Sequence, residues 1–370
     1  MLKPKILFIL HLPPPVHGAA MMGKFIQQSS VINSSFNADY INLSASDNIK
    51  EVGKGGVGKI FSTLTIIVKV SKALLSKKYE LCYITLTAKG YGYYKDVMVV
   101  AILKIFRKKI IYHFHNKGVA TQQQKTLDNL LYRFTFKDTK SILLSSLLYP
   151  DISNYVNRED VFFCANGIPD LETNAAVKKR YNSLNTCNLL FLSNMVAEKG
   201  VLVLLDACKL LKENGTLFEC HFVGAWADVS EDTFNKYVSK NNLSDCIFTH
   251  GKKYDKDKLK FYSSADIFVF PTFYHNECFP LVLLEAMQFG LPLVSTNEGG
   301  IAEIISDGET GFIVPPNNAA ELSAKLEYLI KSPELRLQMG VEGRKRFEEK
   351  FTLDHFENHL SEILKKVISN

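Results

Sequence analysis

Short runs of continuous apolar residues alternate with longer amphipathic stretches through the first half of the chain. The runs cover residues 5–12, 39–43, 80–86, 109–115, 140–146 and 161–166. Continuous apolar character is typical of strands that are covered on both faces, as in a parallel sheet. Between them lie helix-length segments such as 57–78 and 96–108. This strict alternation predicts a doubly wound α/β domain.

The second half repeats the pattern, with apolar runs at 188–194, 218–224, 246–251, 266–272, 291–296 and 311–316. Turn chemistry in the sequence NGIP at 166–169, followed by a polar stretch, marks the boundary. We predict a Rossmann-like domain over 1–166, a linker over 167–187, a second Rossmann-like domain over 188–332, and C-terminal helices over 333–370 that pack back toward the first domain. Ligands of such sheets bind beyond the carboxyl ends of the strands, so we expect the domains to face each other across a cleft.

The net charge of +6 is distributed unevenly along the chain. Residues 1–165 hold 22 Lys and Arg against 10 Asp and Glu, whereas the remaining residues hold 22 against 28. A half with this much positive charge favours an anionic partner, such as phospholipid, polyprenyl pyrophosphate or nucleic acid. The alternative is a solvated face that serves solubility.

Several features indicate a cytoplasmic protein. No stretch reaches the 18 consecutive apolar residues that would predict a transmembrane helix. The apolar run near the N-terminus is short, is broken by His11 and meets three prolines, so we interpret it as a strand rather than a signal peptide. The seven cysteines are odd in number, lack a CxxC pair and lie mostly in apolar segments, which is typical of buried reduced thiols.

The string GKGGVGK at 53–59 matches the GxxxxGK pattern of a phosphate-binding loop. The next position needs Ser or Thr to hold magnesium, and here it is Ile60. The residues before the string are polar, whereas such a loop follows a buried strand directly. We therefore favour a basic loop that leads into a helix, and a P-loop-like regulatory ATPase is a distant alternative.

The segment FVFPTFYHNECFPLVLLEAMQFGLP at 268–292 carries the most chemistry. It predicts a strand that ends at Pro271, a loop, and a helix with Pro280 at its first position that is closed by Gly290. Apolar residues surround the circumference of this helix and Glu285 is its lone carboxylate, so we expect the helix to be buried on all sides. A buried carboxylate needs partners, either ligand hydroxyls or a Lys or Arg of the chain itself.

The start of this helix also predicts an anion site. Backbone N–H groups of Phe279, Leu281 and Val282 have no acceptor inside the helix and suit a phosphate. Glu277 precedes them by a few residues, so carboxylates that accept from sugar hydroxyls flank the phosphate position. This combination predicts a nucleotide-sugar pocket.

Glu277 and Glu285, with seven residues between them, resemble the EX7E motif of retaining glycosyltransferase family 4, which has the GT-B fold. The resemblance covers nearly the whole chain. PPPVHGAA at 13–20 is similar to the glycine-containing first loop, FLSNMVAEKG at 191–200 to the start of the C-terminal domain, and EGGIAEIISDGETGFIVPP at 298–316 to the segment after the motif. It implies retaining transfer of a hexosyl or N-acetylhexosaminyl group from a nucleotide sugar, as in bacterial polysaccharide and cell-envelope biosynthesis.

The resemblance also implies residue roles. Glu277 would contact the hydroxyls of the donor sugar and Glu285 the ribose, while the backbone around Phe279 and Leu281 would hold the pyrophosphate. Lys199 would neutralise the departing phosphate. The resemblance further implies that Gly18 lets the first loop approach the donor closely and that His115 faces the sugar and the reacting centre. We add Gly224 to the donor site.

The chain departs from the family pattern at two places. Asn194 stands where many members have Arg, so part of the diphosphate neutralisation is missing. After the first Glu the family usually has Gly or Ser and then Phe-Gly, whereas this chain has Cys278, Phe279 and Pro280. Pro280 removes one N–H from the anion site, although that N–H would lack a helix partner in any case.

The histidines are further candidates. His113 and His115 lie on one predicted strand, and we expect them to point to opposite faces, with His115, nearer the strand end, as the functional one. His17 in the first loop and His275 before Glu277 are weaker candidates. No His, Cys and Asp cluster has metal-ligand spacing, and the string DKD at 255–257 has the character of an exposed helix start, so we expect neither a metal nor a cofactor.

A basic cluster of Lys104, Arg107, Lys108 and Lys109 follows the apolar segment VMVVAILKIF. Apolar residues beside clustered cations suit a peripheral contact with an anionic membrane that presents a lipid-linked glycan acceptor. The alternative is a helix that packs its apolar face on the sheet. A nucleic-acid partner is not expected, because YGYYKD at 91–96 lacks interleaved basic and aromatic residues. The rival enzyme classes are a nucleotide-sugar epimerase and an inverting transferase on the same fold.

Overall fold

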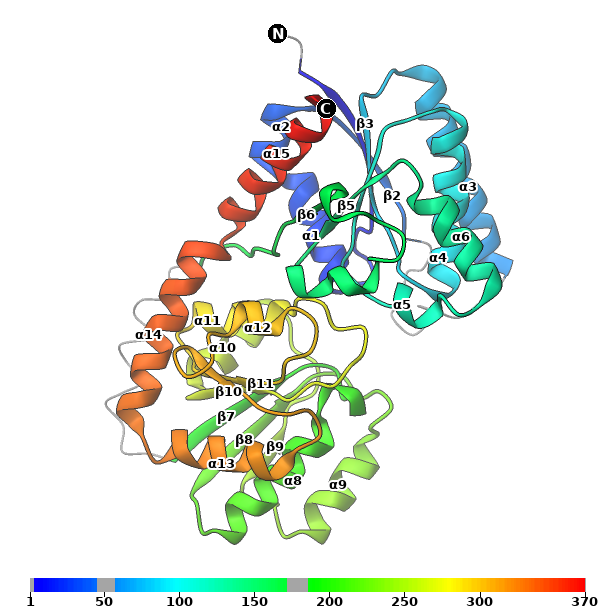
Figure 1. Cartoon of the computed structure of the whole chain (residues 1–370). Helices are drawn as coiled ribbons and strands as arrows, with labels where there is room; N and C mark the ends of the chain where they lie inside the picture. Colours follow the sequence, from blue (N-terminus) through cyan, green and yellow to red (C-terminus); the bar gives the residue numbers. More distant parts are fainter. Residues whose placement is uncertain (1–2, 45–56, 172–185, 370) are drawn as a thin grey trace. The chain divides into compact units, whose positions relative to one another are not determined.

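The computed structural model describes residues 3–44, 57–171 and 186–369 of the chain. These residues form two compact units, which we describe separately (Figure 1). The first unit combines Met1–Gly167 with Leu353–Asn370, and the second is Ile168–Thr352. Residues 53–56 of the GKGGVGK string and most of the predicted linker lie outside the described residues, and the last three residues of the string begin a helix.

The first unit contains a six-stranded sheet in the order β2-β1-β3-β4-β5-β6, in which every pair of neighbours is parallel. Its strands are β1 (Lys5–Leu10), β2 (Asn37–Asn42), β3 (Leu81–Thr85), β4 (Ile110–His113), β5 (Lys140–Leu143) and β6 (Val161–Phe163). Each lies within two residues of its predicted start, and the central strands β1, β3 and β4 are almost wholly buried, as their continuous apolar sequences predict.

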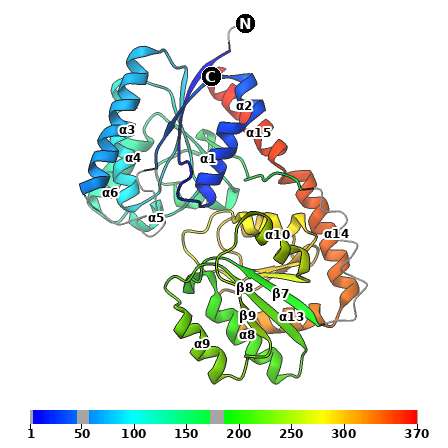
Figure 2. The same cartoon turned by 180° about the vertical axis from the view of Figure 1, so that it is seen from behind.

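Helices cover both faces of this sheet, which confirms the doubly wound α/β fold (Figures 1 and 2). One face carries α1 (Gly18–Gln28), α2 (Ser30–Ser35) and α15 (Leu353–Ser369); the other carries α3 (Val57–Ser76), α4 (Gly90–Ile105) and α6 (Thr126–Phe136). The short helix α5 (Val119–Gln122) and 3-10 turns at Ser146–Asp151 and Arg158–Asp160 complete the unit.

The second unit repeats the arrangement with a parallel sheet in the order β12-β11-β10-β7-β8-β9. Its strands are β7 (Cys187–Leu192), β8 (Phe218–Val223), β9 (Ile247–Thr249), β10 (Ile267–Phe270), β11 (Leu293–Ser295) and β12 (Gly311–Ile313). Its helices are α8 (Val201–Glu213), α9 (Glu231–Lys240), α10 (Asp255–Ser264), α11 (Leu281–Gln288), α12 (Ile301–Ile304), α13 (Ala319–Ile330) and α14 (Pro333–Lys350), with a 3-10 turn at Ala197–Lys199.

The strand order reverses between β7 and β10, because the chain runs outward through β8 and β9 and then returns to the other side of β7. In open parallel sheets, ligands bind beyond the carboxyl ends of the strands at this kind of reversal. The same reversal occurs between β1 and β3 in the first sheet. Each unit therefore has one favoured edge for a ligand.

The predicted group of C-terminal helices divides between the units. Helix α14 belongs to the second unit, where Arg344 donates to the backbone oxygen of Gln288 at 3.1 Å and to Asp170 at 2.8 Å. Helix α15 alone returns to the first unit, where it packs on α2 and places its last carbonyl groups beside Lys109. The expectation that all helices after 333 pack toward the first domain was wrong for α14, which packs on α11 of the second unit.

Candidate functional site

The residues that follow β7 and β10 meet at the reversal in the second sheet. The backbone N–H of Phe273 donates to the Glu198 carbonyl at 2.8 Å, which ties the loop after β10 to the 3-10 turn after β7. Gly200 ends that turn with φ +88°, and an added Cβ would lie 2.2 Å from the Pro271 carbonyl oxygen. Glycine is thus required here by both the backbone conformation and the close approach of the two loops.

This contact brings Lys199 to Glu277. The Nζ atom of Lys199 lies 2.5 Å from Oε2 of Glu277, and the two side chains are 19% and 10% exposed. The same ammonium lies over the ring of Tyr274, 4.3 Å from its centroid. Two residues that the sequence placed in one site, 78 positions apart, therefore form a mostly buried ion pair.

The loop after β11 packs closely against the backbone of Glu277. Gly299 has φ +59°, and an added Cβ would lie 2.4 Å from the backbone oxygen of Glu277. The N–H of Gly300 donates to the Cys278 carbonyl at 2.6 Å. These glycines were not among the predicted site residues, although the consecutive pair in the EGG string was a signal for a close backbone approach.

Helix α11 begins one residue later than predicted. Pro280 is the N-cap with extended backbone, and the first helical residue is Leu281. The N–H groups of Leu281 and Val282 thus open the helix, where no intrahelical acceptor exists for them. Cys278, Phe279 and Pro280 are buried, so their side chains pack inside the unit.

The surroundings of Glu285 differ from the prediction. Leu281, Val282 and Glu285 form a half-buried strip on α11, so the helix is not buried on all sides. Glu285 has partners in its own chain: Lys258 at 2.5 Å from Oε1, and the Tyr262 hydroxyl, which donates to Oε2 at 2.7 Å. The alternative in which a lysine of the protein pairs with Glu285 is therefore correct. Burial raises the pKa of the Tyr262 hydroxyl, and the negative charge of Glu285 raises it further.

Two other predicted donor-site residues lie at the ends of neighbouring strands. Asn194 is exposed just after β7, in a tight turn in which its carbonyl accepts from Val196 N–H at 2.7 Å. Gly224 follows β8, and an added Cβ would lie 1.8 Å from the Ser193 carbonyl oxygen. The absence of a side chain at Gly224 thus serves the packing of one loop on the other.

The first unit holds the remaining predicted site residues at the carboxyl ends of β1 and β4. Gly18 is the first residue of α1, and Nδ1 of the N-cap residue His17 accepts from Ala20 N–H at 3.3 Å. Both ring nitrogens of His115 are buried without a hydrogen-bond partner among the residues that the structure describes. Burial lowers the pKa of His115 to about 3, and the charge of His17 contributes.

His113 and His115 do not point to opposite faces. Their ring centroids are 4.4 Å apart, because residues two positions apart in extended chain share one face. His113 is fully buried, and its Nδ1 lies 2.5 Å from the Tyr83 hydroxyl. His115, beyond the end of β4, is the more accessible of the two.

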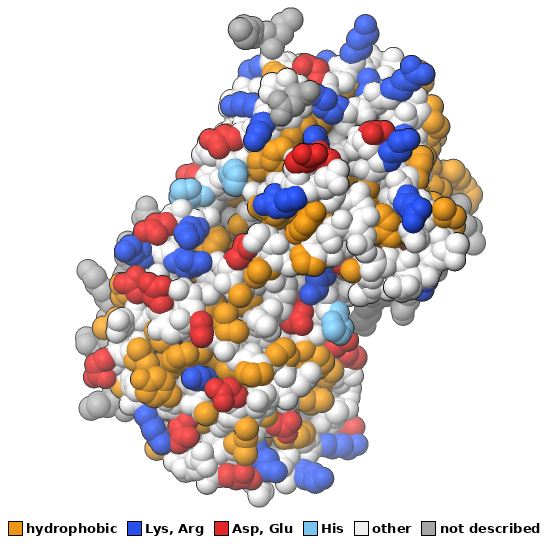
Figure 3. Space-filling model, viewed as in Figure 1, with side chains coloured by type: hydrophobic (Ala, Val, Ile, Leu, Met, Phe, Trp, Pro, Cys, Tyr) orange, Lys and Arg blue, Asp and Glu red, His pale blue; other side chains and the backbone are white. Residues whose placement is uncertain are grey.

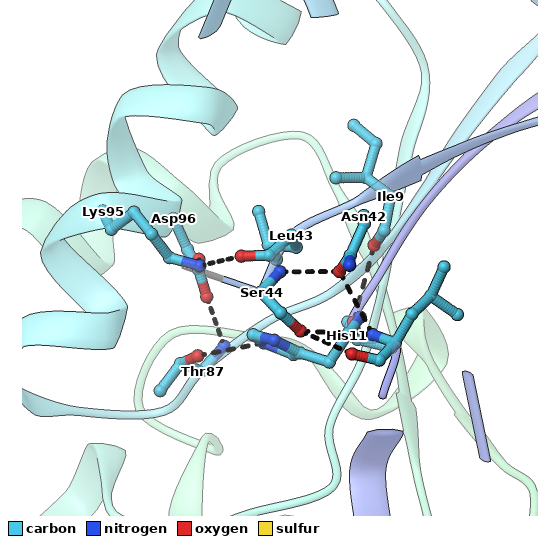
Figure 4. A network of polar contacts seen from close by, with 10 residues as sticks. Ile9, His11, Asn42, Leu43, Ser44, Thr87, Lys95 and Asp96 are labelled. Atoms are coloured by element: carbon cyan, nitrogen blue, oxygen red, sulfur yellow. Dashed lines mark hydrogen bonds and ion pairs between the residues drawn. The ribbon is translucent and has the colours of Figure 1, made fainter. Parts of the chain in front are cut away.

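A polar network that was not predicted from the sequence lies at the same edge (Figure 4). Lys95 and Asp96, both in α4, form a buried ion pair at 3.2 Å; Lys95 also donates to the Leu43 carbonyl at 2.5 Å, and Asp96 accepts from Thr87 N–H at 2.8 Å. Burial lowers the pKa of His11 well below 6.5, with Lys95 as the next cause. The sequence signal for this buried network was the pair of adjacent charged residues inside the apolar string YYKDVMVV.

Two of the four cations in the predicted membrane cluster are engaged within the protein. Lys104 donates to the Lys137 carbonyl at 2.5 Å, and Lys109 donates to the Val367 carbonyl at 3.0 Å. Over the described ranges 3–44, 57–171 and 186–369, no group of three His, Cys, Asp or Glu is arranged to hold a metal ion.

Comparison with solved structures shows which class of proteins has this fold. The fold resembles that of a glycosyltransferase from Rickettsia africae, with a TM-score of 0.75, 20% identity, and 100% of this chain and 99% of that one covered. It also resembles Anabaena Alr3699/HepE in complex with UDP, with a TM-score of 0.75, 16% identity, and 98% and 100% covered. The chain thus has the two-domain α/β fold of the GT-B glycosyltransferases, as predicted.

The sequence match narrows the class to a family. Residues 177–346 match the model of glycosyl transferases group 1. The capsular polysaccharide biosynthesis glycosyltransferase CapM of Staphylococcus aureus is 29% identical over 196 residues, which are 52% of this chain and 50% of CapM. The amylovoran biosynthesis glycosyltransferase AmsK of Erwinia amylovora is 29% identical over 183 residues, 48% and 44% of the two chains. The chain spans about half the length of these relatives, and it carries a domain of the glycosyl transferases group 1 family.

Proposed function

We propose that this protein transfers a glycosyl group from a nucleotide sugar to a glycan or lipid-linked glycan, with retention of anomeric configuration and without a metal ion. The observation that carries the proposal is the Lys199–Glu277 pair beside the start of α11, at the strand reversal of a glycosyl transferases group 1 domain. A cation, free helix N–H groups and a carboxylate are gathered there, and these groups complement a diphosphate and sugar hydroxyls.

The donor would lie along α11. The N–H groups of Leu281 and Val282 and the ammonium of Lys199 would bind the diphosphate, and Glu277 would accept from sugar hydroxyls. Glu285 would accept from the ribose, because each of its oxygens has a second lone pair beyond those used by Lys258 and Tyr262. The proteins with similar folds include Alr3699/HepE in complex with UDP-glucose, which supports a nucleotide-sugar donor.

In the transfer step, the bond between the anomeric carbon and the phosphate oxygen breaks, and its electron pair leaves with the phosphate. Lys199, Asn194 and the start of α11 would stabilise that charge. The acceptor hydroxyl oxygen would bond to the anomeric carbon on the same face while its proton passes to the leaving phosphate. His115, held neutral by burial, would act as a hydrogen-bonding group rather than as a cation.

The names of the relatives support the proposed class of acceptor. The relatives CapM and AmsK are named for capsular polysaccharide and amylovoran biosynthesis, which favours a growing bacterial glycan. A lipid-linked glycan would be presented at a membrane surface. The cluster of Lys104, Arg107, Lys108 and Lys109 was the contact that the sequence suggested. Lys104 and Lys109 donate to carbonyl groups of the protein, and Arg107 is exposed.

A screen of nucleotide sugars for donor hydrolysis and thermal stabilisation tests the class of enzyme. We expect at least one nucleotide sugar to be hydrolysed with the anomeric configuration kept, as followed by NMR, and hydrolysis to survive EDTA. Lys199→Ala should lower turnover about a hundredfold, whereas the exposed Lys236→Ala on α9 should leave it unchanged. An inverted product or loss of activity with EDTA would contradict the mechanism, and epimerised donor would indicate a different enzyme.

A further inference from the structure

The outward face of α3 is unusually apolar for a helix on the surface of a protein. Phe61, Leu64, Val68 and Leu75 are 68%, 51%, 63% and 76% exposed. They follow helical spacing, while Ile66, Val70 and Leu74 on the opposite side are buried against the unit. Helix α3 thus has apolar residues on both sides, and only one side is covered.

The apolar character continues onto the two helices beside α3. Helix α4 packs against α3, and α6 packs against α4, so the three form one layer on the sheet (Figures 1 and 2). The outward side chains of α4 and α6 include further exposed apolar residues: Met98, Ile105, Leu127, Leu130 and Phe134. Figure 3 shows hydrophobic side chains with interspersed lysines and arginines along the right-hand edge, where Figure 1 places α3 and α6. We call this surface the α3–α4–α6 face.

The charges on this face have one sign. Helix α3 contains no Asp or Glu, and its outward side carries Lys69 and Lys72. Helices α4 and α6 contain one acidic residue each, Asp96 and Asp128, which are 0% and 3% exposed. Both are bonded inside the unit, Asp96 to Thr87 N–H and Asp128 to the Tyr94 hydroxyl. The exposed charges of the three helices are therefore all positive.

The described helices of the second unit differ. Helix α9 is exposed through Glu231, Asp232 and Lys236, with acidic and basic groups paired on its surface. The exposed large apolar residues of that unit, such as Leu217, are spread over several elements, and Leu337 and Val341 on α14 are a pair one turn apart. A continuous apolar surface rimmed by one sign of charge, in contrast, indicates a binding surface.

We propose that the α3–α4–α6 face binds the surface of an anionic phospholipid bilayer. Apolar side chains of the kind on α3 enter the boundary between headgroups and acyl chains, and lysines at the same level pair with anionic headgroups. A surface that binds another protein usually carries charges of both signs or is a neutral apolar patch. A surface whose exposed charges are all positive is instead complementary to an anionic bilayer. No helix in the described part of the chain is long and apolar enough to cross a membrane, so the contact is peripheral.

This inference goes beyond the proposed sugar transfer and beyond the cluster at 104–109. Its centre is α3, whose exposed lysines Lys69 and Lys72 have no ion-pair partner among the described residues. None of the residues involved is one that we propose to contact the donor. Vesicle binding and donor hydrolysis can therefore fail independently.

Co-sedimentation of the full chain with vesicles tests the proposal. We expect binding to vesicles of equimolar phosphatidylcholine and phosphatidylglycerol, little binding to phosphatidylcholine alone, and a decrease as salt is raised. The double variant Lys69→Glu/Lys72→Glu and the double variant Leu64→Ser/Val68→Ser should each lower the partition coefficient about tenfold or more. The matched control is Leu217→Ser, which removes an 80% exposed leucine from the second unit and should change the partition less than twofold.

Three results would overturn the proposal. The parent chain fails to bind anionic vesicles at low salt, or the α3 variants bind as well as the parent, or Leu217→Ser reduces binding equally. Size-exclusion chromatography covers the competing occupant, because a dimer that Leu64→Ser/Val68→Ser converts to monomer would identify a second copy of the chain on this face. Circular dichroism and unchanged donor hydrolysis without lipid establish that each variant is folded.

Discussion

Replacing Glu277 by Gln would remove the carboxylate that pairs with Lys199 while keeping nearly the same side-chain shape. In the parent, the two groups are 2.5 Å apart, and the ammonium is only 19% exposed. The amide of Gln can still accept a hydrogen bond but carries no charge. The variant therefore leaves a mostly buried ammonium without its counter-charge, and we expect the second unit to lose stability.

The magnitude follows from the burial of the pair. Breaking a fully buried ion pair by removing one partner costs about 3–5 kcal/mol, and breaking an exposed pair costs less than about 1 kcal/mol. Lys199 retains some access to water and its contact with the Tyr274 ring, so we expect a loss of about 2 kcal/mol in the free energy of unfolding. For a unit of this size, that corresponds to a fall in Tm of about 4–8 °C.

Urea denaturation of the full chain, followed by circular dichroism, measures the effect. The matched control is Glu213→Gln, which breaks an exposed Lys–Glu pair with Lys209 at 3.9 Å in the same unit and should cost less than about 0.5 kcal/mol. The double variant Glu277→Gln/Lys199→Met should lose less than the sum of the single variants. If Glu277→Gln is as stable as Glu213→Gln, the pair contributes nothing in solution and our account of the site's electrostatics is wrong.

Three further variants and conditions probe other parts of the structure. Arg344→Met should cost about 3 kcal/mol in urea denaturation, because Arg344 is 8% exposed and bonds to Gln288 and Asp170; a cost below about 1 kcal/mol would contradict its role in anchoring α14. Glu285→Gln should leave the fold intact and weaken the binding of nucleoside diphosphate about tenfold in calorimetry, and equal affinity would remove Glu285 from the donor site. Burial holds the pKa of His113 well below 6.5, so its neutral form contributes stability that is fully present above pH 6.5 and is lost as the pH falls further; the slope should approach about 1.4 kcal/mol per pH unit, and a melting temperature that stays constant from pH 7 to 5 would refute this.

The strands could be predicted from the sequence because parallel strands are buried on both faces, and short continuous apolar runs between turn residues are typical of such strands. Strand ends were less predictable. The run 5–12 continues for two residues beyond β1, where the N–H of His11 donates to Thr85 Oγ1 and that of Leu12 donates to Asn42 Oδ1. Side chains of neighbouring strands thus end the ladder, and periodicity does not contain that information.

The side chains that pair with the site residues were harder to predict from the sequence. Lys199 and Glu277 could be placed together because the family resemblance aligned them, but Lys258 reaches Glu285 from α10, a helix whose sequence reads as polar surface. Likewise, the period of α3 indicates an amphipathic helix but does not tell which apolar side stays uncovered. These outcomes depend on tertiary packing between elements that are far apart in sequence.

The return of α15 to the first unit has a consequence for the order of folding during synthesis. The first sheet and its other helices leave the ribosome before the 185 residues of 168–352, and only then does α15 emerge to pack on α2 and beside Lys109. At typical translation rates the delay is roughly 10–40 s. During that interval the first unit exposes the apolar surface that Phe356, Leu360 and Leu364 of α15 later cover. We therefore expect chaperones to bind the nascent chain until its second unit is complete.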